Sequence, residues 1–370
     1  MIKIGVLAKA RQRHGGTLLY TLSMLDALAR LPKTDFQLMV FAEPNNQEYA
    51  ALGLSIVAAP GMLKLIASRL LRRNPYAAVD FVLAPVYSSA LLACGKPFAF
   101  TLHDLQERHY PENFSLITRC WRRVVNGLLA SRAQRIICES EFVRSDIIRY
   151  IGVSEQKIEV IPAPPIAMLR DANTDDSAIA TVRAKFSLPE SYIFYPAQFW
   201  QHKNHRRLID AFALVLRNHP DCVLVLTGKK RDEYERVFAR VSELGLTTNV
   251  RHIGYVAQSE LAALYKGATV AVIPTLFESI SIPIYEAFSI GTAVCASNVV
   301  AIPEQVGDAG LLFDPNSVED IANKINTLLS NSVLRAQLIK NGHRRMQFVT
   351  HNEYAIRLSD LIAKVFLCKN

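Results

Sequence analysis

Short apolar runs rich in β-branched and aromatic residues alternate with helical patterns through the first 165 residues of this chain. The helical patterns include Leu18–Arg30, Leu116–Ser131 and Glu141–Ile151. Such alternation predicts a mostly parallel β-sheet with helices on both faces, because parallel strands need crossover connections. The expected strands are Ile2–Ala8, Phe36–Phe41, Ser55–Ala58, Phe81–Ala84, Phe98–Thr101, Arg135–Cys138 and Ile158–Ile161.

The alternation stops near Pro162 and restarts near residue 190, after a polar segment that contains several prolines. A chain of 370 residues also exceeds the size at which single cores usually divide. We therefore expect an α/β protein with two doubly wound, Rossmann-like domains and a ligand-binding cleft between the carboxyl ends of both sheets. The expected parts are an N-terminal domain over 1–165, a linker over 166–189, a C-terminal domain over 190–352, and a helix within 353–370 that crosses back to the first domain.

The second block contains the strongest functional pattern, a strand, a short polar loop and a helix. The strand Val270–Ile273 is apolar, Pro283 suits a first helical position, and Gly291 suits a helix C-cap. The free N–H groups and the dipole at such a helix start favour a phosphate. Glu278 and Glu286 flank the loop, and carboxylates there would bind sugar hydroxyls rather than the phosphate. The same spacing also fits a helix-dipole role for Glu286 and a solvated loop position for Glu278.

Other polar residues follow expected strands. His103 could bond a sugar hydroxyl or move a proton, although a lone histidine is often structural. Lys203 and Lys229 are candidate cations for a phosphate, and the aromatic residues beside Lys203 fit equally well a lid on the core. Gly15 and Gly16 open the first helix and allow close backbone approach or a tight turn. No G-x-G-x-x-G is present, so a nicotinamide cofactor is not indicated.

The net charge of +9 is concentrated in the first domain, mostly in two apolar and basic stretches, Met62–Arg73 and Arg119–Val125. Such stretches could lie on an anionic membrane or face an anionic acceptor; the alternative is a helix packed on its own sheet with a solvated basic face. Zinc-finger spacing and an aromatic-basic RNA signature are missing, so no nucleic-acid partner is expected.

The cysteines are scattered, the N-terminus has no basic leader, and the apolar runs are too short to span a bilayer. Together these features predict a cytoplasmic protein. We expect it to be soluble or to rest on the inner face of the cell membrane.

From Gly254 to Pro315 many short motifs occur in one order, and over this stretch the chain resembles the retaining nucleotide-sugar glycosyltransferases of family 4. That family has the GT-B fold, and the resemblance extends over nearly the whole chain. The motifs are Gly254-Tyr255-Val256, Leu264-Tyr265, Ile273-Pro274-Thr275, Phe277-Glu278, Glu286-Ala287, Gly291-Thr292, Pro303-Glu304 and Phe313-Asp314-Pro315.

The resemblance implies roles for the candidate residues. Glu286 would bind the ribose of the nucleotide, Glu278 would lie at the donor sugar, and His103 would approach that sugar from the first domain. Lys203 and the N–H groups of Ile280, Ser281 and Ile282 would hold the diphosphate, and Gly15 and Gly16 would lie against the diphosphate or the acceptor. The family transfers sugars with retention and without a metal or another cofactor.

Two departures from the family pattern stand out. Ser279 and Ser281 replace the usual glycines after the first glutamate, which keeps the backbone N–H groups and adds two hydroxyl donors. Gln198 and Phe199 stand where an arginine usually precedes the lysine. Either His202, Arg206 or Lys229 supplies the second charge, or the diphosphate is held more loosely.

The resemblance implies transfer of a hexose or deoxyhexose from a nucleotide-sugar to a glycan or lipid-linked acceptor in bacterial surface polysaccharide synthesis. The sequence around Gln198 and His103 most resembles that of O-antigen mannosyl- or rhamnosyltransferases. This resemblance favours GDP-mannose as the donor over a UDP-, TDP- or ADP-sugar. The alternatives are another GT-B enzyme, such as a glycogen-synthase-like transferase or a sugar-nucleotide epimerase, and a non-catalytic glycan- or partner-binding protein.

Overall fold

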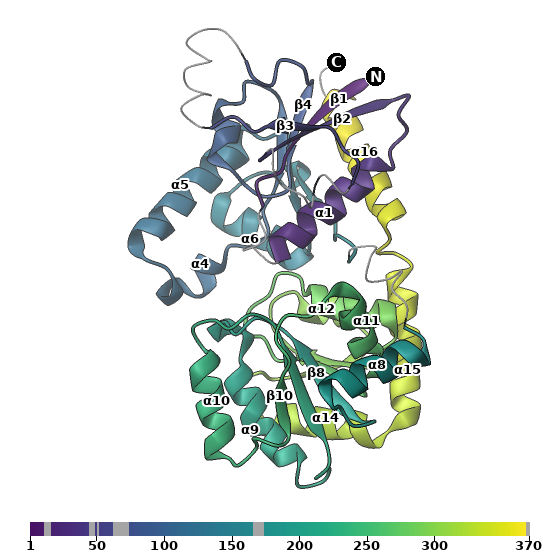
Figure 1. Cartoon of the computed structure of the whole chain (residues 1–370). Helices are drawn as coiled ribbons and strands as arrows, with labels where there is room; N and C mark the ends of the chain where they lie inside the picture. The colour runs from purple at the N-terminus through teal and green to yellow at the C-terminus, as the bar shows by residue number, and fades with distance from the viewer. Residues whose placement is uncertain (11–15, 44–48, 50–51, 62–73, 166–173, 368–370) are drawn as a thin grey trace. The chain divides into compact units, whose positions relative to one another are not determined.

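The computed structural model describes residues 1–10, 16–43, 49, 52–61, 74–165 and 174–367. The chain divides into two compact units, residues 1–166 with 349–370 and residues 167–348 (Figure 1). The basic stretch with Arg69, Arg72 and Arg73 lies outside the described residues, as does Gly15.

The first unit contains a parallel sheet of seven strands in the order β3-β2-β1-β4-β5-β6-β7. Consecutive strands run outward from β1 in both directions, so the order reverses between β1 and β4. The strands are β1 (Ile2–Leu7), β2 (Phe36–Ala42), β3 (Ile56–Ala58), β4 (Phe81–Ala84), β5 (Phe98–Thr101), β6 (Arg135–Cys138) and β7 (Ile158–Val160). The helices include α1 (Gly16–Ala29), α4 (Gln106–His109), α5 (Leu116–Arg132), α6 (Glu141–Ile151) and α16 (His351–Leu367).

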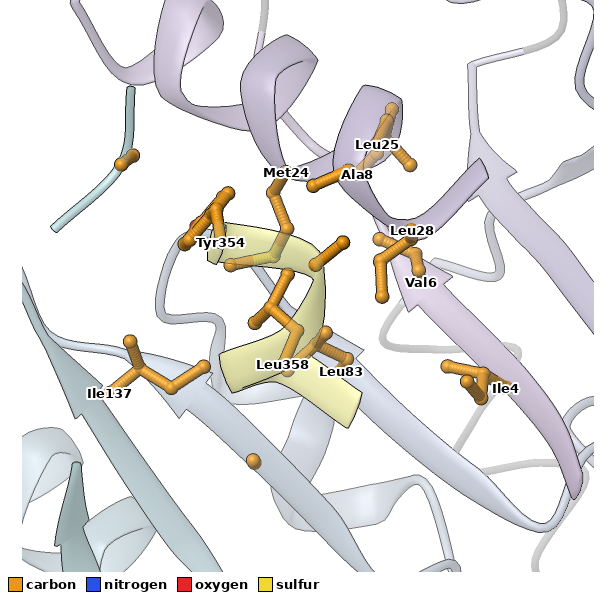
Figure 2. Close-up of a cluster of buried hydrophobic side chains, with 14 of the residues drawn as sticks. Ile4, Val6, Ala8, Met24, Leu25, Leu28, Leu83, Ile137, Tyr354 and Leu358 are labelled. Carbon is orange, nitrogen blue, oxygen red and sulfur yellow. The ribbon is translucent and has the colours of Figure 1, made fainter. Parts of the chain in front are cut away.

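Two apolar layers cover the two faces of this sheet. On one face, α1 and α16 pack on the central strands, with Met24, Leu28, Tyr354 and Leu358 all buried (Figure 2). On the other face, α5 and α6 contribute to a second buried cluster. The helix α16 thus joins the first unit although the whole second unit separates it in sequence.

The second unit contains a parallel sheet of six strands in the order β10-β9-β8-β11-β12-β13, which reverses between β8 and β11. The strands are β8 (Tyr192–Pro196), β9 (Val223–Thr227), β10 (Val250–His252), β11 (Val270–Ile273), β12 (Val294–Ser297) and β13 (Gly310–Phe313). The helices are α8 (Asp176–Phe186), α9 (His205–Val215), α10 (Tyr234–Glu243), α11 (Gln258–Gly267), α12 (Ile282–Ile290), α13 (Ile302–Val306), α14 (Val318–Ser330) and α15 (Ser332–Met346).

Strand β8 divides its side chains between the two faces of this sheet, as the period of two requires. Ile193 and Tyr195 join the buried cluster that α9, α10 and α14 cover. Phe194 points the other way, and its ring meets that of Tyr265 on α11 at a centroid distance of 5.0 Å. Within the segment expected to be a linker, α8 packs on α11 and belongs to the second unit.

The predicted fold class is confirmed, since both sheets are parallel and doubly wound. Gly291 ends α12 in the left-handed conformation, as the sequence predicts. The hydroxyl of Ser140 caps α6 by accepting from the N–H of Val143. Among the helices of the described residues, none has both the length and the apolar character that a membrane span requires.

Candidate functional site

The polar residues that the sequence singles out in the second unit cluster where the strand order reverses. Strands β8 and β11 are neighbours there, and the loop 197–204 follows one while the loop 274–281 follows the other. In doubly wound sheets the loops after such a pair of strands diverge to opposite faces and leave a binding place at the carboxyl ends. This edge of the sheet is therefore the candidate site.

Lys203 and Glu278 form an ion pair across the two loops. Lys203 Nζ lies 2.5 Å from Glu278 Oε1, and the two side chains are only 17% and 15% exposed. A partly buried pair of this kind is screened less by salt than a surface pair. The family resemblance assigned a separate role to each residue, and the structure brings the two side chains into direct contact.

Asn204 fixes the loop that carries Lys203. This buried residue adopts the left-handed conformation, with φ of 60°, and its Nδ2 donates to the carbonyl oxygens of Pro274 and Pro315, both at 2.9 Å. The hydroxyl of Tyr195 donates to the carbonyl oxygen of Lys203 at 2.9 Å. Because these groups belong to strand ends in the sheet, the backbone at Lys203 is held rigidly beside β11.

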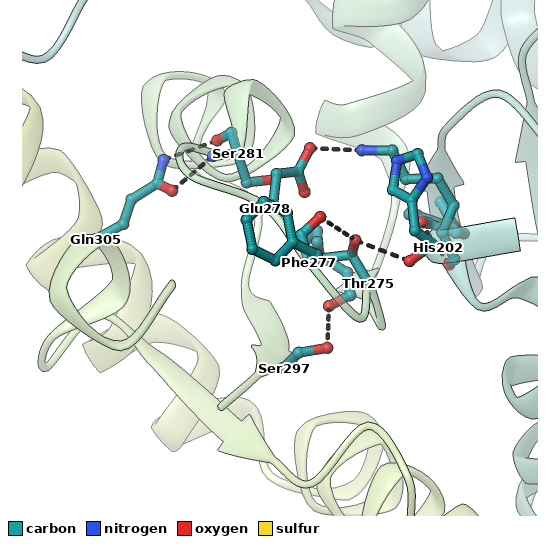
Figure 3. A network of polar contacts seen from close by, with 10 residues as sticks. His202, Thr275, Phe277, Glu278, Ser281, Ser297 and Gln305 are labelled. Carbon is teal, nitrogen blue, oxygen red and sulfur yellow. Dashed lines mark hydrogen bonds and ion pairs between the residues drawn. The ribbon is translucent and has the colours of Figure 1, made fainter. Parts of the chain in front are cut away.

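The loop 274–281 is attached to the same backbone. The N–H of Leu276 donates to the carbonyl oxygen of His202 at 2.7 Å, and the hydroxyl of Thr275 donates to that oxygen at 3.1 Å (Figure 3). Below the loop, the hydroxyl of Ser297 donates to the carbonyl oxygen of Ile273 at 3.2 Å. The backbone positions of Lys203 and Glu278 are thus coupled by hydrogen bonds.

The turn before α12 is held by Gln305 of α13. Gln305 Oε1 accepts from the N–H of Ser281 at 2.8 Å, and Gln305 Nε2 donates to the Ser281 carbonyl oxygen at 2.7 Å (Figure 3). The amide of Ser281, which the resemblance assigned to a diphosphate, therefore already has a protein partner. The buried hydroxyl of Ser281 has no hydrogen-bond partner among the described residues.

Helix α12 begins one residue earlier than the sequence indicated. Ile282 is its first residue and Pro283 its second, so Pro283 removes one N–H from the helix start. Ser279, Ile280 and Ile282 are half-buried, and the roles of Ile280 and Ile282 as amide donors to a phosphate stay predictions.

Glu286 lies inside α12 and is 5% exposed. Its Oε2 accepts a hydrogen bond from the hydroxyl of Tyr265 on α11 at 2.7 Å. Burial raises the pKa of Glu286 to about 7, and the bond from Tyr265 opposes that rise only in part. The carboxyl group of Glu286 is therefore partly neutral and partly charged near neutral pH. Its burial inside α12 differs from the exposed position that a residue serving only the helix dipole would have.

The position of Gln198 has a cation beside it that the sequence reasoning missed. Arg231 donates through Nε to Gln198 Oε1 at 2.9 Å, and its guanidinium lies 4.9 Å from the centroid of the Trp200 ring. The residue follows β9 in a loop, and its approach to Gln198 depends on the neighbouring strands β8 and β9. Only the pairing of those strands, which the sequence does not give, would have revealed it.

Two other cation candidates of the second unit, Lys229 and Arg206, are on the surface. Lys229 is exposed, and its ammonium nitrogen lies 5.5 Å from the centroid of the Tyr255 ring. Arg206 is exposed on α9. Phe199, one of the aromatic residues near Lys203, is fully buried in the core and stacks on His205. This position supports the alternative that the Phe199 ring covers the core.

In the first unit, His103 follows β5 and uses both ring nitrogens. Nδ1 lies 2.7 Å from Glu139 Oε2, and Nε2 lies 3.0 Å from the carbonyl oxygen of Pro85. Burial lowers the pKa of His103, but the hydrogen bond and charge of Glu139 outweigh that effect and leave the pKa above its ordinary value. Since a carbonyl and a carboxylate both accept, the imidazolium form satisfies both contacts. Gly16 begins α1 at the same end of this sheet.

Within the described residues, no three histidine, cysteine, aspartate or glutamate side chains gather as a metal site would require.

Comparison with known proteins identifies two consecutive matches along the chain. Residues 15–164 match the family model described as Glycosyltransferase Family 4, and residues 180–345 match the model described as Glycosyl transferases group 1. The O-antigen chain mannosyltransferase B of Escherichia coli is 32% identical over 204 residues, which cover 52% of this chain and 51% of that protein.

The MMP alpha-(1->4)-mannosyltransferase of Mycolicibacterium hassiacum is 30% identical over 225 residues, which cover 59% of this chain and 50% of that protein. The chain thus spans about half the length of these two relatives.

Among solved structures, Anabaena Alr3699/HepE in complex with UDP matches with a TM-score of 0.80 at 20% identity, over 98% of this chain and all of that chain. This likeness agrees with the two parallel sheets and supports the GT-B fold. The two family models match residues 15–164 and 180–345 in succession, and the chain belongs to the family 4 glycosyltransferases.

Proposed function

We propose that this protein is a retaining, metal-independent glycosyltransferase that moves a hexose or deoxyhexose from a nucleotide-sugar to a glycan or lipid-linked acceptor. GDP-mannose is the favoured donor, and cytoplasmic synthesis of a bacterial surface polysaccharide is the favoured setting. The mannosyltransferase relatives named above support the sugar, and the UDP bound to the Anabaena neighbour supports a nucleotide diphosphate as the leaving group.

The observation that carries the proposal is the Lys203–Glu278 pair at the point where the second sheet reverses its strand order. A departing nucleoside diphosphate gains negative charge at the bond that breaks, and a fixed ammonium group stabilises that charge. Glu278 neutralises Lys203 and keeps its side chain in place. A bound diphosphate would take over the ammonium group and leave Glu278 to accept hydrogen bonds from the donor sugar.

Three further groups support the nucleotide part of the proposal. Glu286 would accept from the ribose hydroxyls, and Arg231 beside Gln198 would supply the second positive charge for the diphosphate. The unpaired hydroxyl of Ser281 would donate to a phosphate oxygen at the start of α12.

A thermal-shift panel with GDP, UDP, TDP and ADP tests the donor class, because a bound nucleotide stabilises the folded state in proportion to the logarithm of its concentration over Kd. We expect GDP to give the largest shift. Incubation with GDP-mannose, an acceptor extract and EDTA should then give a product whose anomeric configuration, read by NMR, matches that of the donor sugar. Inversion, or loss of turnover with EDTA, would contradict the proposed mechanism.

Binding of a nucleotide without turnover on any acceptor would instead support the non-catalytic alternative. Release of free GDP together with an epimerised sugar would support the epimerase alternative.

A further inference from the structure

Helix α5 of the first unit exposes a continuous apolar face. Ile117, Trp121, Val124 and Leu128 are spaced by four, three and four residues, so they share one side of the helix. Ile117 is 83% exposed, Val124 59% and Trp121 49%, and Leu116 extends the same surface at the helix start. These five residues are called the α5 ridge below. Figure 1 shows α5 at the edge of its unit beside α4.

The opposite side of α5 holds the helix in the fold without help from the ridge. Val125 and Leu129 are buried in the core of the unit. Arg122 donates to Asp104 Oδ1 at 2.9 Å, lies 3.0 Å from Glu107 Oε2, and has its guanidinium 5.4 Å from the Phe114 ring centroid. The ridge therefore contributes little to folding, and its exposure in water is unfavourable by itself.

The charged residues on α5 itself all have the same sign. No aspartate or glutamate occurs within α5, while Arg119, Arg123 and Arg132 all lie on it. Arg123 and Arg132 are exposed, on the two sides of the ridge by helical periodicity. The partly buried Arg122 is neutralised by its two carboxylate partners. The exposed side of α5 is thus an apolar strip with positive charge along its edges.

We propose that the α5 ridge docks on an anionic phospholipid bilayer. The apolar side chains enter the boundary between headgroups and acyl chains, Trp121 lies at the level where aromatic residues are favoured, and the arginines contact anionic headgroups. The inference goes beyond the proposed reaction, because it assigns a membrane-contacting surface that the transfer chemistry does not require. It selects a bilayer over an acidic protein because of the long apolar strip between the charges.

Two matched double variants test the surface. Ile117→Glu with Val124→Glu changes the ridge, and Ile356→Glu with Val333→Glu makes the same changes at exposed positions of α16 and α15. In sedimentation with phosphatidylglycerol vesicles at low salt, we expect the ridge variant to bind at least ~10-fold more weakly than the control variant. Phosphatidylcholine vesicles should bind the unmodified protein much more weakly, as should high salt.

The ridge also carries its own optical reporter, since the chain has only two tryptophans, Trp121 and Trp200. In a Trp200→Phe background, anionic vesicles should shift the Trp121 emission to shorter wavelength, and brominated acyl chains should quench it. Circular dichroism and thermal melts check that all variants stay folded.

Equal vesicle binding by the two double variants would overturn the proposal, and so would an unquenched Trp121. A dimer in size-exclusion chromatography that only the ridge variant dissociates, without vesicle binding by the unmodified protein, would overturn it too and assign the face to a second copy of the chain.

Discussion

A carboxyl group removed from water ionises at a higher pH than one in solvent, and Glu286 has this property because α12 buries it against Tyr265. Its pKa of about 7 in the folded protein exceeds the ordinary value of 4.5. Between these two values the folded protein keeps a proton that the unfolded chain loses. The free energy of unfolding therefore falls as pH rises through this window.

Glu286→Gln should remove that pH dependence, because glutamine does not titrate and still accepts from Tyr265. The free energy of unfolding of the variant, relative to the unmodified protein, should rise between pH 4.5 and 7 by up to about 3 kcal/mol and then level off. Urea denaturation of both proteins at several pH values measures this difference. A difference that stays constant with pH would show that Glu286 ionises normally.

Lys203→Ala should lower kcat of sugar transfer by ~100-fold, because the ammonium group stabilises charge that develops as the diphosphate leaves. Steady-state kinetics with varied donor separate this effect from a change in KM. Lys229→Ala is the matched control, since this lysine follows the adjacent strand β9 and its ammonium group lies over the Tyr255 ring. Similar losses of kcat in both variants would contradict the special role of Lys203.

Residue identities were the part of the site that the sequence could predict. Lys203, Glu278 and Glu286 stand out because their motifs follow strands. The contact between Lys203 and Glu278 and the hydrogen bond from Tyr265 to Glu286 depend on strand order, which the sequence does not give. Arg231 has no motif at all. It is noticed only when β9 lies beside β8 and its side chain reaches Gln198.

At the scale of single elements, the turn that leads into α12 depends on a residue from a different helix. Gln305 bonds both the N–H and the carbonyl of Ser281, as a neighbouring strand would. Serines replace flexible glycines nearby, and this clamp gives the turn one defined shape.

Gln305→Ala should raise the donor KM about tenfold and lower the free energy of unfolding by about 1–3 kcal/mol, because two buried backbone groups lose their partner. Donor titration and urea denaturation give the two numbers. Gln337→Ala on the exposed side of α15 is the control: it removes one side-chain hydrogen bond, to Asn341, and should leave the donor KM unchanged. An unaltered donor KM with reduced stability would limit Gln305 to a structural role.

Strand boundaries were predictable where an apolar run is short and flanked by polar residues or glycine. The bounds of β4, β5, β6 and β11 agree with the sequence analysis at both ends. Helix α8 was missed because its sequence, with Asp175 as cap and many small or polar residues, has only one buried side chain, Val182. Such a helix has almost no periodic apolar signal.

At the scale of the whole molecule, each unit has a core of its own. A substitution in one core should therefore destabilise the unit that contains it and leave the other unit folded. Leu358 of α16 and Leu328 of α14 are both fully buried, in the first and the second core respectively. Either one replaced by alanine should lose about 2–5 kcal/mol of stability in its own unit.

The two variants should respond differently to a nucleotide. GDP should still protect the second unit of Leu358→Ala from proteolysis with near-normal affinity, and protect Leu328→Ala only at higher concentration. Limited proteolysis over a range of GDP concentrations measures both. Loss of protection in Leu358→Ala would mean that the second unit does not hold the nucleotide by itself.

Helix α16 also sets the order of events on the ribosome. The first unit is synthesised up to residue 166, yet the helix that covers one face of its sheet emerges only after the second unit has been made. During that interval the apolar surface of α1 and the central strands has no cover of its own. A nascent chain of this kind exposes apolar surface while almost two hundred further codons are translated, and a premature stop just before α16 leaves that surface uncovered.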